Sequence, residues 1–250
     1  FPMCQACEQE YLDSADRRFH AEPVACPDCG PMLSFCRGKD VISGNEAVLQ
    51  AAIAALSNGD IIAVKGIGGY HLVCDAGDDA AVSKLRARKP RPHKPLAVML
   101  PDVHAGGVHK HEVFNEYVQI DRHELEFLLQ PTRPLLLVKK SQTSKLSAHI
   151  SPGLGEVGVM FPYSPLHHLL LQDYGKPLVA TSANISGDPV LTDNADLQRN
   201  LVHIADVFLH HDRPIERPAD DPVYRSIHST PRPIRLGRGI APLELCLPFE

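Results

Sequence analysis

The chain has 250 residues, a formal net charge of -5 and 44 % hydrophobic residues. This length and apolar content allow a buried core in one large or two modest domains. No apolar run approaches the roughly 20 residues of a membrane-spanning helix, and the net acidity argues against duplex nucleic acid as the main partner. The start, FPMCQAC, has neither an initiator Met nor the features of a signal peptide. We therefore expect a cytoplasmic protein that is a piece of a longer one.

Four of the seven cysteines form the first motif. Cys4 and Cys7 are separated by two residues, as are Cys26 and Cys29. Two such pairs can surround one metal ion tetrahedrally, so the spacing predicts a zinc site, with His20 as an alternative to one sulfur. Disulfide pairing is the other interpretation, and the absence of a secretion signal disfavours it.

The predicted zinc site has a structural role. Four sulfur ligands leave no position for a reactive water molecule. A unit this short buries little core, so the metal would supply the missing folding energy. We predict a zinc-finger unit at residues 1–36, a linker at 37–44 and an α/β domain at 45–250.

The rest of the chain alternates between helical and strand patterns. A helix is expected over 46–58, with Asn45 as a cap and Gly59 as its end, and another over 78–89, before Pro90. This alternation predicts a mixed sheet of about seven strands with flanking helices. The expected strands are 60–66, 96–100, 135–140, 157–161, 177–184, 206–210, 222–227 and 233–237. The other expected helices are 103–117, 121–129, 164–175 and 193–202.

A basic segment, RARKPRPHKP, occupies residues 86–95. Arg86 and Arg88 fall in the last helical turn, where cations are favourable whatever the function. Lys89, Arg91 and Lys94 instead alternate with prolines in an extended stretch, where residues two apart point the same way. The strand that follows disfavours a floppy tail. The segment is thus either support for a helix end or an ordered phosphate site.

Two further polar clusters follow predicted strands. KGIGGY at 65–70 is glycine-rich but lacks the spacing of a dinucleotide site, so a tight turn explains it equally well. TSANISG at 181–187 places Ser182 and Asn184 where ligands bind sheets, although these residue types also favour ordinary turns. The sequence contains no Walker A motif, GxSxG or HExxH. A reaction that needs no protein nucleophile, in which the protein only aligns ATP with an acceptor, remains compatible with the sequence.

Several motifs together resemble the HypF family of hydrogenase-maturation carbamoyltransferases. KGIGGYHLVCDA, LRARKPRPHKPLAVM, GVMFPYSPLHHLLL and LVATSANISG resemble its YrdC-like domain, and CQACEQEYLDSADRRFHAEPVACPDCGP resembles the second of its two zinc-finger units. RPIERPADDPVYR and IRLGRGIAP extend the resemblance along essentially the whole chain. It implies an open twisted mixed sheet of the YrdC type, with flanking helices, after a small Cys4 zinc-knuckle module.

The resemblance also implies a reaction. Carbamate, released from carbamoyl phosphate by an acylphosphatase domain, reacts with ATP to give carbamoyl-adenylate and pyrophosphate, with Mg²⁺ assisting. A Kae1-like domain then passes the carbamoyl group to the C-terminal cysteine of the partner HypE, toward the cyanide ligands of [NiFe] hydrogenase. By this resemblance Lys89, Arg91 and Lys94 are catalytic and bind the nucleotide phosphates. Ser182 and Asn184 bind the nucleotide too, and Lys65 is a further contact.

Two departures and two alternatives accompany this hypothesis. The family often has DDSV and RRARG where this chain has DDPV and RLGRG, so the lost serine and arginine either loosen a contact near the nucleotide or are neutral. Without the acylphosphatase and Kae1-like domains, the piece is not expected to complete the reaction. The alternatives are a threonylcarbamoyl-adenylate synthase of tRNA modification, which lacks the zinc unit, and a non-catalytic module that binds double-stranded RNA, which the net acidity disfavours.

Overall fold

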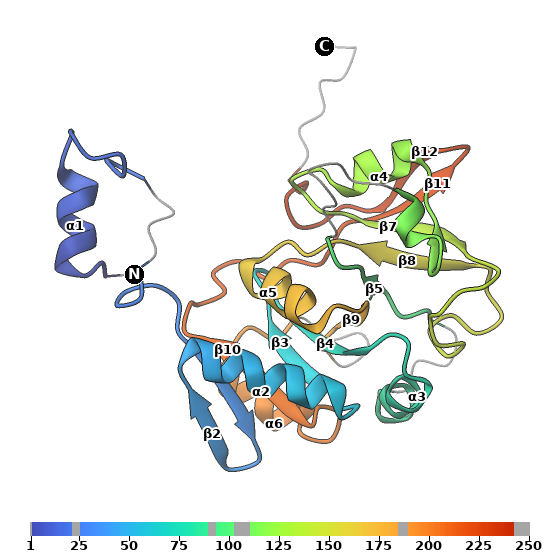
Figure 1. Cartoon of the computed structure of the whole chain (residues 1–250), viewed down its shortest axis with the longest axis horizontal. Helices are drawn as coiled ribbons and strands as arrows, with labels where there is room; N and C mark the ends of the chain where they lie inside the picture. The colour runs from blue at the N-terminus through green and yellow to red at the C-terminus, as the bar shows by residue number, and fades with distance from the viewer. Residues whose placement is uncertain (1, 22–25, 90–93, 103–110, 185–189, 243–250) are drawn as a thin grey trace.

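The body of the protein is one mixed sheet with helices on both faces (Figure 1). This computed structural model describes residues 2–21, 26–89, 94–102, 111–184 and 190–242. Within these ranges, the helices are α1 (Gln5–Leu12), α2 (Asn45–Ser57), α3 (Asp79–Arg88), η1 (His111–Phe114, a 3-10 helix), α4 (Arg122–Leu128), α5 (Pro165–Tyr174) and α6 (Asn194–Leu201). The predicted α/β architecture, a mixed sheet with flanking helices after a cysteine module, is confirmed.

Twelve strands form the sheet in the described part of the chain, where about seven were expected. They are β1 (Leu33–Arg37), β2 (Asp40–Ser43), β3 (Ile62–Lys65), β4 (Tyr70–Asp75), β5 (Val98–Met99), β6 (Val118–Gln119), β7 (Leu135–Lys140), β8 (Glu156–Met160), β9 (Leu178–Ser182), β10 (Val207–His211), β11 (Val223–Ile227) and β12 (Thr230–Arg235). Their order is β12-β11-β7-β8-β5-β9-β4-β3-β10-β1-β2, and β6 pairs with β7. The pairs β3–β10, β5–β8 and β7–β11 are parallel, and the others are antiparallel.

The central strands are buried on both faces, which explains their continuous apolar sequences. Ile62 and Val64 of β3 pack in a core with α2 and α5. Ala63, between them, belongs to the core on the opposite face with Leu72 of β4 and with α3, α4 and α6. Because neighbouring side chains of a strand point to opposite faces, one apolar strand supplies both cores.

The linker predicted for 37–44 is wrong. β1 and β2 form an antiparallel pair across this segment, and β1 also pairs with β10, so the segment belongs to the sheet. Gly38 permits the tight turn between them, at a φ of +60°. The burial of β1 is partial and β2 is exposed, which explains why their sequences lack a strong strand pattern.

Asn45 does not cap α2, contrary to the prediction. Gly44 occupies the N-cap position, at a φ of +99°. The Asn45 side chain instead accepts a hydrogen bond from the backbone N–H of Leu33 at 2.8 Å and donates one to the carbonyl oxygen of Pro31 at 3.2 Å. It therefore ties the start of the helix to the chain that enters β1.

The helix expected at 103–117 is only partly described. Residues 103–110 lie outside the described ranges, η1 covers 111–114, and β6 begins at Val118. The second helix expected in this region corresponds to α4, which Asp121 caps together with Glu124. Among the helices described, none is both long enough and apolar enough to cross a bilayer.

Candidate functional site: a Cys4 cluster and a cavity at the end of β9

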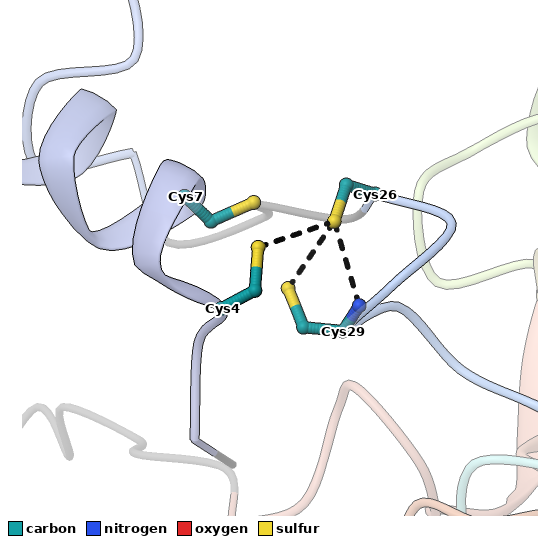
Figure 2. A group of neighbouring side chains, drawn as sticks. All are labelled: Cys4, Cys7, Cys26 and Cys29. Carbon is teal, nitrogen blue, oxygen red and sulfur yellow. Dashed lines mark hydrogen bonds between the residues drawn. The ribbon is translucent and has the colours of Figure 1, made fainter.

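The four cysteines of the first motif meet at one point beside α1 (Figure 2). Cys4 and Cys7 lie at the start of this helix, while Cys26 and Cys29 come from the turn that precedes β1. All four sulfurs lie within 4.8 Å of one another. The Cys26 Sγ lies 3.6 Å from that of Cys4 and 3.5 Å from that of Cys29. Ligands about 2.3 Å from a tetrahedral zinc ion lie roughly 3.8 Å apart, so the cluster fits zinc.

The chemistry of these thiols also fits a metal site. Backbone N–H groups of Cys29 and Asp28 lower the pKa of the Cys26 thiol to about 6. Hydrogen bonding to Cys26, together with burial, raises the pKa of Cys7. The two thiols thus have pKa values shifted in opposite directions. A divalent cation would favour the thiolate form of both, because thiolates are its ligands. His20, the alternative ligand, stacks on Phe19 with ring centroids 4.1 Å apart and lies outside the group of four.

A cavity of about 540 Å³ lies where β9 ends. Its walls come from β7, β8, β9, β11, β12 and the segment before β5. The lining combines apolar side chains with cations and anions: Lys94, Pro95, Leu96, Ala97, Leu135, Leu137, Gly158, Ala180, Thr181, Ser182, Asn184, Asp220, Asp221, Val223, Ile234 and Arg235. Three predicted site residues, Lys94, Ser182 and Asn184, therefore line one cavity.

Lys89 is bonded to Ser182, a residue that lines this cavity. Its ammonium group donates a hydrogen bond to the carbonyl oxygen of Ser182, and the residue is 4 % exposed. The Ser182 hydroxyl in turn donates to the side-chain oxygen of Asn184 at 2.8 Å. The basic segment and the TSAN segment, predicted separately, thus meet. Arg91, the third predicted cation, lies outside the described residues.

The two arginines of the helix end bind other segments. Arg86 donates to the carbonyl oxygens of His149 and Ile150, which fixes the chain before β8. Arg88 forms an ion pair of 2.6 Å with Asp206, just before β10. Their role in the structure is to anchor α3, as expected of helix-end support.

Lys65 is placed apart from the other predicted residues. It is 4 % exposed and donates hydrogen bonds to Asn194 Oδ1 at 2.9 Å and to the carbonyl oxygen of His211 at 3.1 Å. Tyr70 donates to the same Asn194 oxygen at 2.6 Å and contacts His210 Nδ1 at 2.8 Å. Lys65 is not among the described residues that line the cavity; it belongs to a buried network at the start of α6.

Asp221 joins the cavity to a second, deeper polar cluster. Its Oδ2 contacts His71 Nε2 at 2.9 Å, and its Oδ1 accepts hydrogen bonds from Arg238 Nη2 at 3.1 Å and Nε at 3.3 Å. The Arg238 guanidinium stacks 3.6 Å from the ring centre of Tyr163. Burial opposes ionisation of Asp221, but His71 and Arg238 outweigh it and lower the pKa of the carboxyl. Asp221 is therefore a carboxylate at neutral pH.

None of His71, Asp221 and Arg238 was predicted as a site residue, although the DDPV and RLGRG segments, which contain Asp221 and Arg238, were expected near the nucleotide. The three residues are far apart along the chain, so no local pattern joins them. One signal was present: His71 interrupts the apolar run of a strand buried at every position. A polar residue there needs a buried partner.

Comparisons with known proteins identify the family of this chain. Residues 54–237 match the family of Sua5, YciO and YrdC proteins, described as "Telomere recombination", and residues 3–36 match the "HypF finger". Carbamoyltransferase HypF of Rhodobacter capsulatus is 45 % identical over 248 residues, which are 99 % of this chain and 32 % of that protein. A crystal structure of full-length HypF in a phosphate- and nucleotide-bound form is similar with a TM-score of 0.85 and 43 % identity, over 97 % of this chain and 30 % of that one.

Threonylcarbamoyl-AMP synthase of Photobacterium profundum is a more distant relative, 26 % identical over 61 % of this chain and 80 % of that protein. The chain belongs to the Sua5, YciO and YrdC family. Its finger and its similarity along nearly the whole length place it with carbamoyltransferase HypF within that family. It spans about a third of the length of the HypF relatives it matches.

Proposed function

We propose that this chain binds ATP and carbamate and forms carbamoyl-adenylate with release of pyrophosphate. The observation that carries the proposal is the cavity at the end of β9, which Lys94, Ser182 and Asn184 line together and where Lys89 donates to the Ser182 carbonyl oxygen. Cations and polar hydrogen-bond donors beside an apolar wall suit a nucleotide. The description of a related HypF structure as phosphate- and nucleotide-bound supports the same ligand class.

In the proposed reaction, a carbamate oxygen attacks the α-phosphorus of ATP. The bond between this phosphorus and the oxygen leading to the β-phosphorus breaks, and pyrophosphate leaves with the electron pair. Lys94 and Arg91 would balance the charge that grows on the phosphate oxygens, and Ser182 and Asn184 would orient them. ATP would enter as its magnesium complex, whose cation neutralises the leaving group.

The wider role is part of the same proposal. The carbamoyl group would pass to the C-terminal cysteine of HypE, for the cyanide ligands of [NiFe] hydrogenase. An acylphosphatase unit would supply the carbamate, and a Kae1-like unit would complete the transfer. The Cys4 cluster would hold zinc structurally. The part of the protein described here would perform the adenylation step.

Carbamate-dependent exchange of pyrophosphate into ATP tests the adenylation step. Lys94→Ala should weaken ATP binding about tenfold or more, because a charge-assisted hydrogen bond contributes roughly 1.5–3 kcal/mol. Calorimetry measures this, with zinc determined on the same sample. Lys39→Ala, an exposed lysine in the turn between β1 and β2, is the matched control. Equal ATP affinity in the Lys94 and Lys39 variants would contradict the site assignment, as would undiminished exchange after Lys89→Ala plus Arg91→Ala.

The similarity to threonylcarbamoyl-AMP synthase favours one second candidate. An enzyme of that type would release pyrophosphate only when threonine is added with bicarbonate. The same exchange assay therefore separates the two reactions through their acid substrates.

A further inference from the structure

We infer that Asp221 selects carbamate as the acid substrate by accepting a hydrogen bond from the carbamate amino group. This inference rests on the proposed adenylation. A second, narrow cavity adjoins the large one and shares Ser182, Asp220 and Asp221 with it. The narrow cavity is also lined by Gly69, Tyr70, His71, Tyr163, Val190 and Ala219.

The size of the narrow cavity limits what can enter it. Its volume is about 10 Å³, against about 540 Å³ for the large cavity. A space of this size holds one group as large as a water molecule. The amino group of carbamate has that size, whereas the side chain of threonine is larger. The glycine-rich turn helps to close the space, because Gly68 packs directly against Ala219 and Gly69 against Val190.

The chemistry of Asp221 suits an amino group. An ionised carboxylate offers about four acceptor positions and no donor. In the described structure, Arg238 uses two of these positions on Oδ1 and His71 uses one on Oδ2. The acceptor position that remains lies on Oδ2 of Asp221. Asp221 lines both cavities. A carbamate N–H can fill this position, and a methyl group of the same size cannot.

The charge of Asp221 is compatible with an anionic substrate. The guanidinium of Arg238 neutralises it, and this arginine is itself held by the carbonyl oxygens of Thr132 and Arg133 at 3.2 Å and 3.4 Å. A carboxylate that is already paired can accept a hydrogen bond without strongly repelling a second anion.

The position of Asp221 is fixed by its backbone as well. Its carbonyl oxygen accepts hydrogen bonds from Arg235 Nε at 3.1 Å and Nη2 at 2.9 Å. The backbone carbonyl oxygen of Asp220, the preceding residue, accepts a hydrogen bond from the backbone N–H of Arg238 at 2.8 Å. A side chain held in this way can discriminate between groups that differ by one hydrogen bond.

Pyrophosphate exchange with two acids of equal shape tests the inference. Carbamate carries an amino group where acetate carries a methyl group. In the native chain, kcat/KM for carbamate should exceed that for acetate about ten- to hundredfold. In Asp221→Asn this ratio should fall at least about tenfold, because Arg238 retains the amide oxygen and the amide N–H₂ then faces the substrate amino group. Asp173→Asn makes the same charge change at an exposed position of α5 that lines neither cavity, and should keep the native ratio.

Each outcome decides between the hypotheses. An unchanged ratio in Asp221→Asn overturns the inference and leaves the proposed function intact. If the native chain shows no acid-dependent exchange at all, the proposed function fails and the inference fails with it. If Asp221→Asn is inactive with both acids or does not fold, the native chain decides: it should use N-methylcarbamate at least about tenfold less well than carbamate, and equal use of the two would overturn the inference.

Discussion

At the scale of single residues, the buried histidine of α5 couples stability to pH. His167 is 2 % exposed, its Nδ1 contacts the Ser164 hydroxyl at 2.8 Å, and its Nε2 has no partner among the described residues. Burial, and then the nearby His71, lower the pKa of His167 to about 3. The unfolded chain therefore takes up a proton below about pH 6.5 that the folded chain excludes. This contribution to stability is complete above that pH and is lost as the pH falls toward 3.

We expect the free energy of unfolding to decrease by up to about 1.4 kcal/mol per pH unit from this histidine below pH 6.5. His167→Gln should remove that part of the decrease between pH 7.5 and 5.0, as measured by urea unfolding. The remaining decrease should include His210, whose pKa burial lowers to about 4. His168→Gln, at the next position and less buried, is the control. If both variants keep the native pH dependence, the burial of His167 does not have this effect.

The candidate site was predictable from sequence only where its residues are close along the chain. Ser182 and Asn184 follow a buried strand, and Lys94 precedes one, so local patterns placed all three near a sheet end. Asp221, by contrast, contacts His71 and Arg238, and His71 is far from it along the chain. This cluster forms only in the folded protein, so no local pattern indicates it. Lys65 shows the reverse case, because a glycine-rich turn beside it suggested a ligand site, whereas the folded chain uses its charge in a buried network.

At the scale of elements, the junction between β1 and α2 depends on one exposed side chain. Asn45→Ala removes two hydrogen bonds to the chain before β1, and should lower the free energy of unfolding by about 1 kcal/mol. Glu46→Ala, also exposed and next in the helix, should change it less. Urea unfolding of the two variants provides the test. Equal stability of the Asn45 variant and the native chain would show that solvent replaces these bonds without loss.

Several strands, including the two before α2, were not predicted from the sequence. β1 and β2 are short and partly or wholly exposed, so pairing with β10 and with each other defines them more than composition does. β4 was hidden because it follows a glycine-rich turn and its apolar run lacks alternation. Strands with long apolar sequences, such as β3 and β7, were expected near the positions where they occur.

At the scale of the whole molecule, the cysteine unit and the sheet meet through few described contacts. Arg213 donates to the carbonyl oxygen of Cys29, and Asp212 accepts from the backbone N–H of Met32 at 3.0 Å. Figure 1 shows α1 set apart from the helices that cover the sheet. The two parts therefore have separate sources of stability: metal ligation for one, and apolar cores for the other.

We expect removal of zinc by a chelator to unfold the cysteine unit and to leave the sheet folded. Hydrogen exchange should become fast in α1 and stay slow in β3 and β9. ATP affinity should change less than twofold, because the cavity takes no lining residue from the cysteine unit within the described ranges. Adding zinc back is the control and should restore slow exchange in α1. Loss of ATP binding on chelation would contradict this independence.

The two outer strands differ in their capacity to recruit another chain. β12 reads TPRPIR and places prolines opposite Ser226 and Tyr224 of β11. Proline has no N–H, so this border is a poor template for a further strand. β2 is exposed along its length, and its Val41 is 63 % exposed. Aggregation by strand addition should therefore begin at β2 rather than at β12, which makes a charged residue at position 41 the first substitution to consider for a more soluble protein.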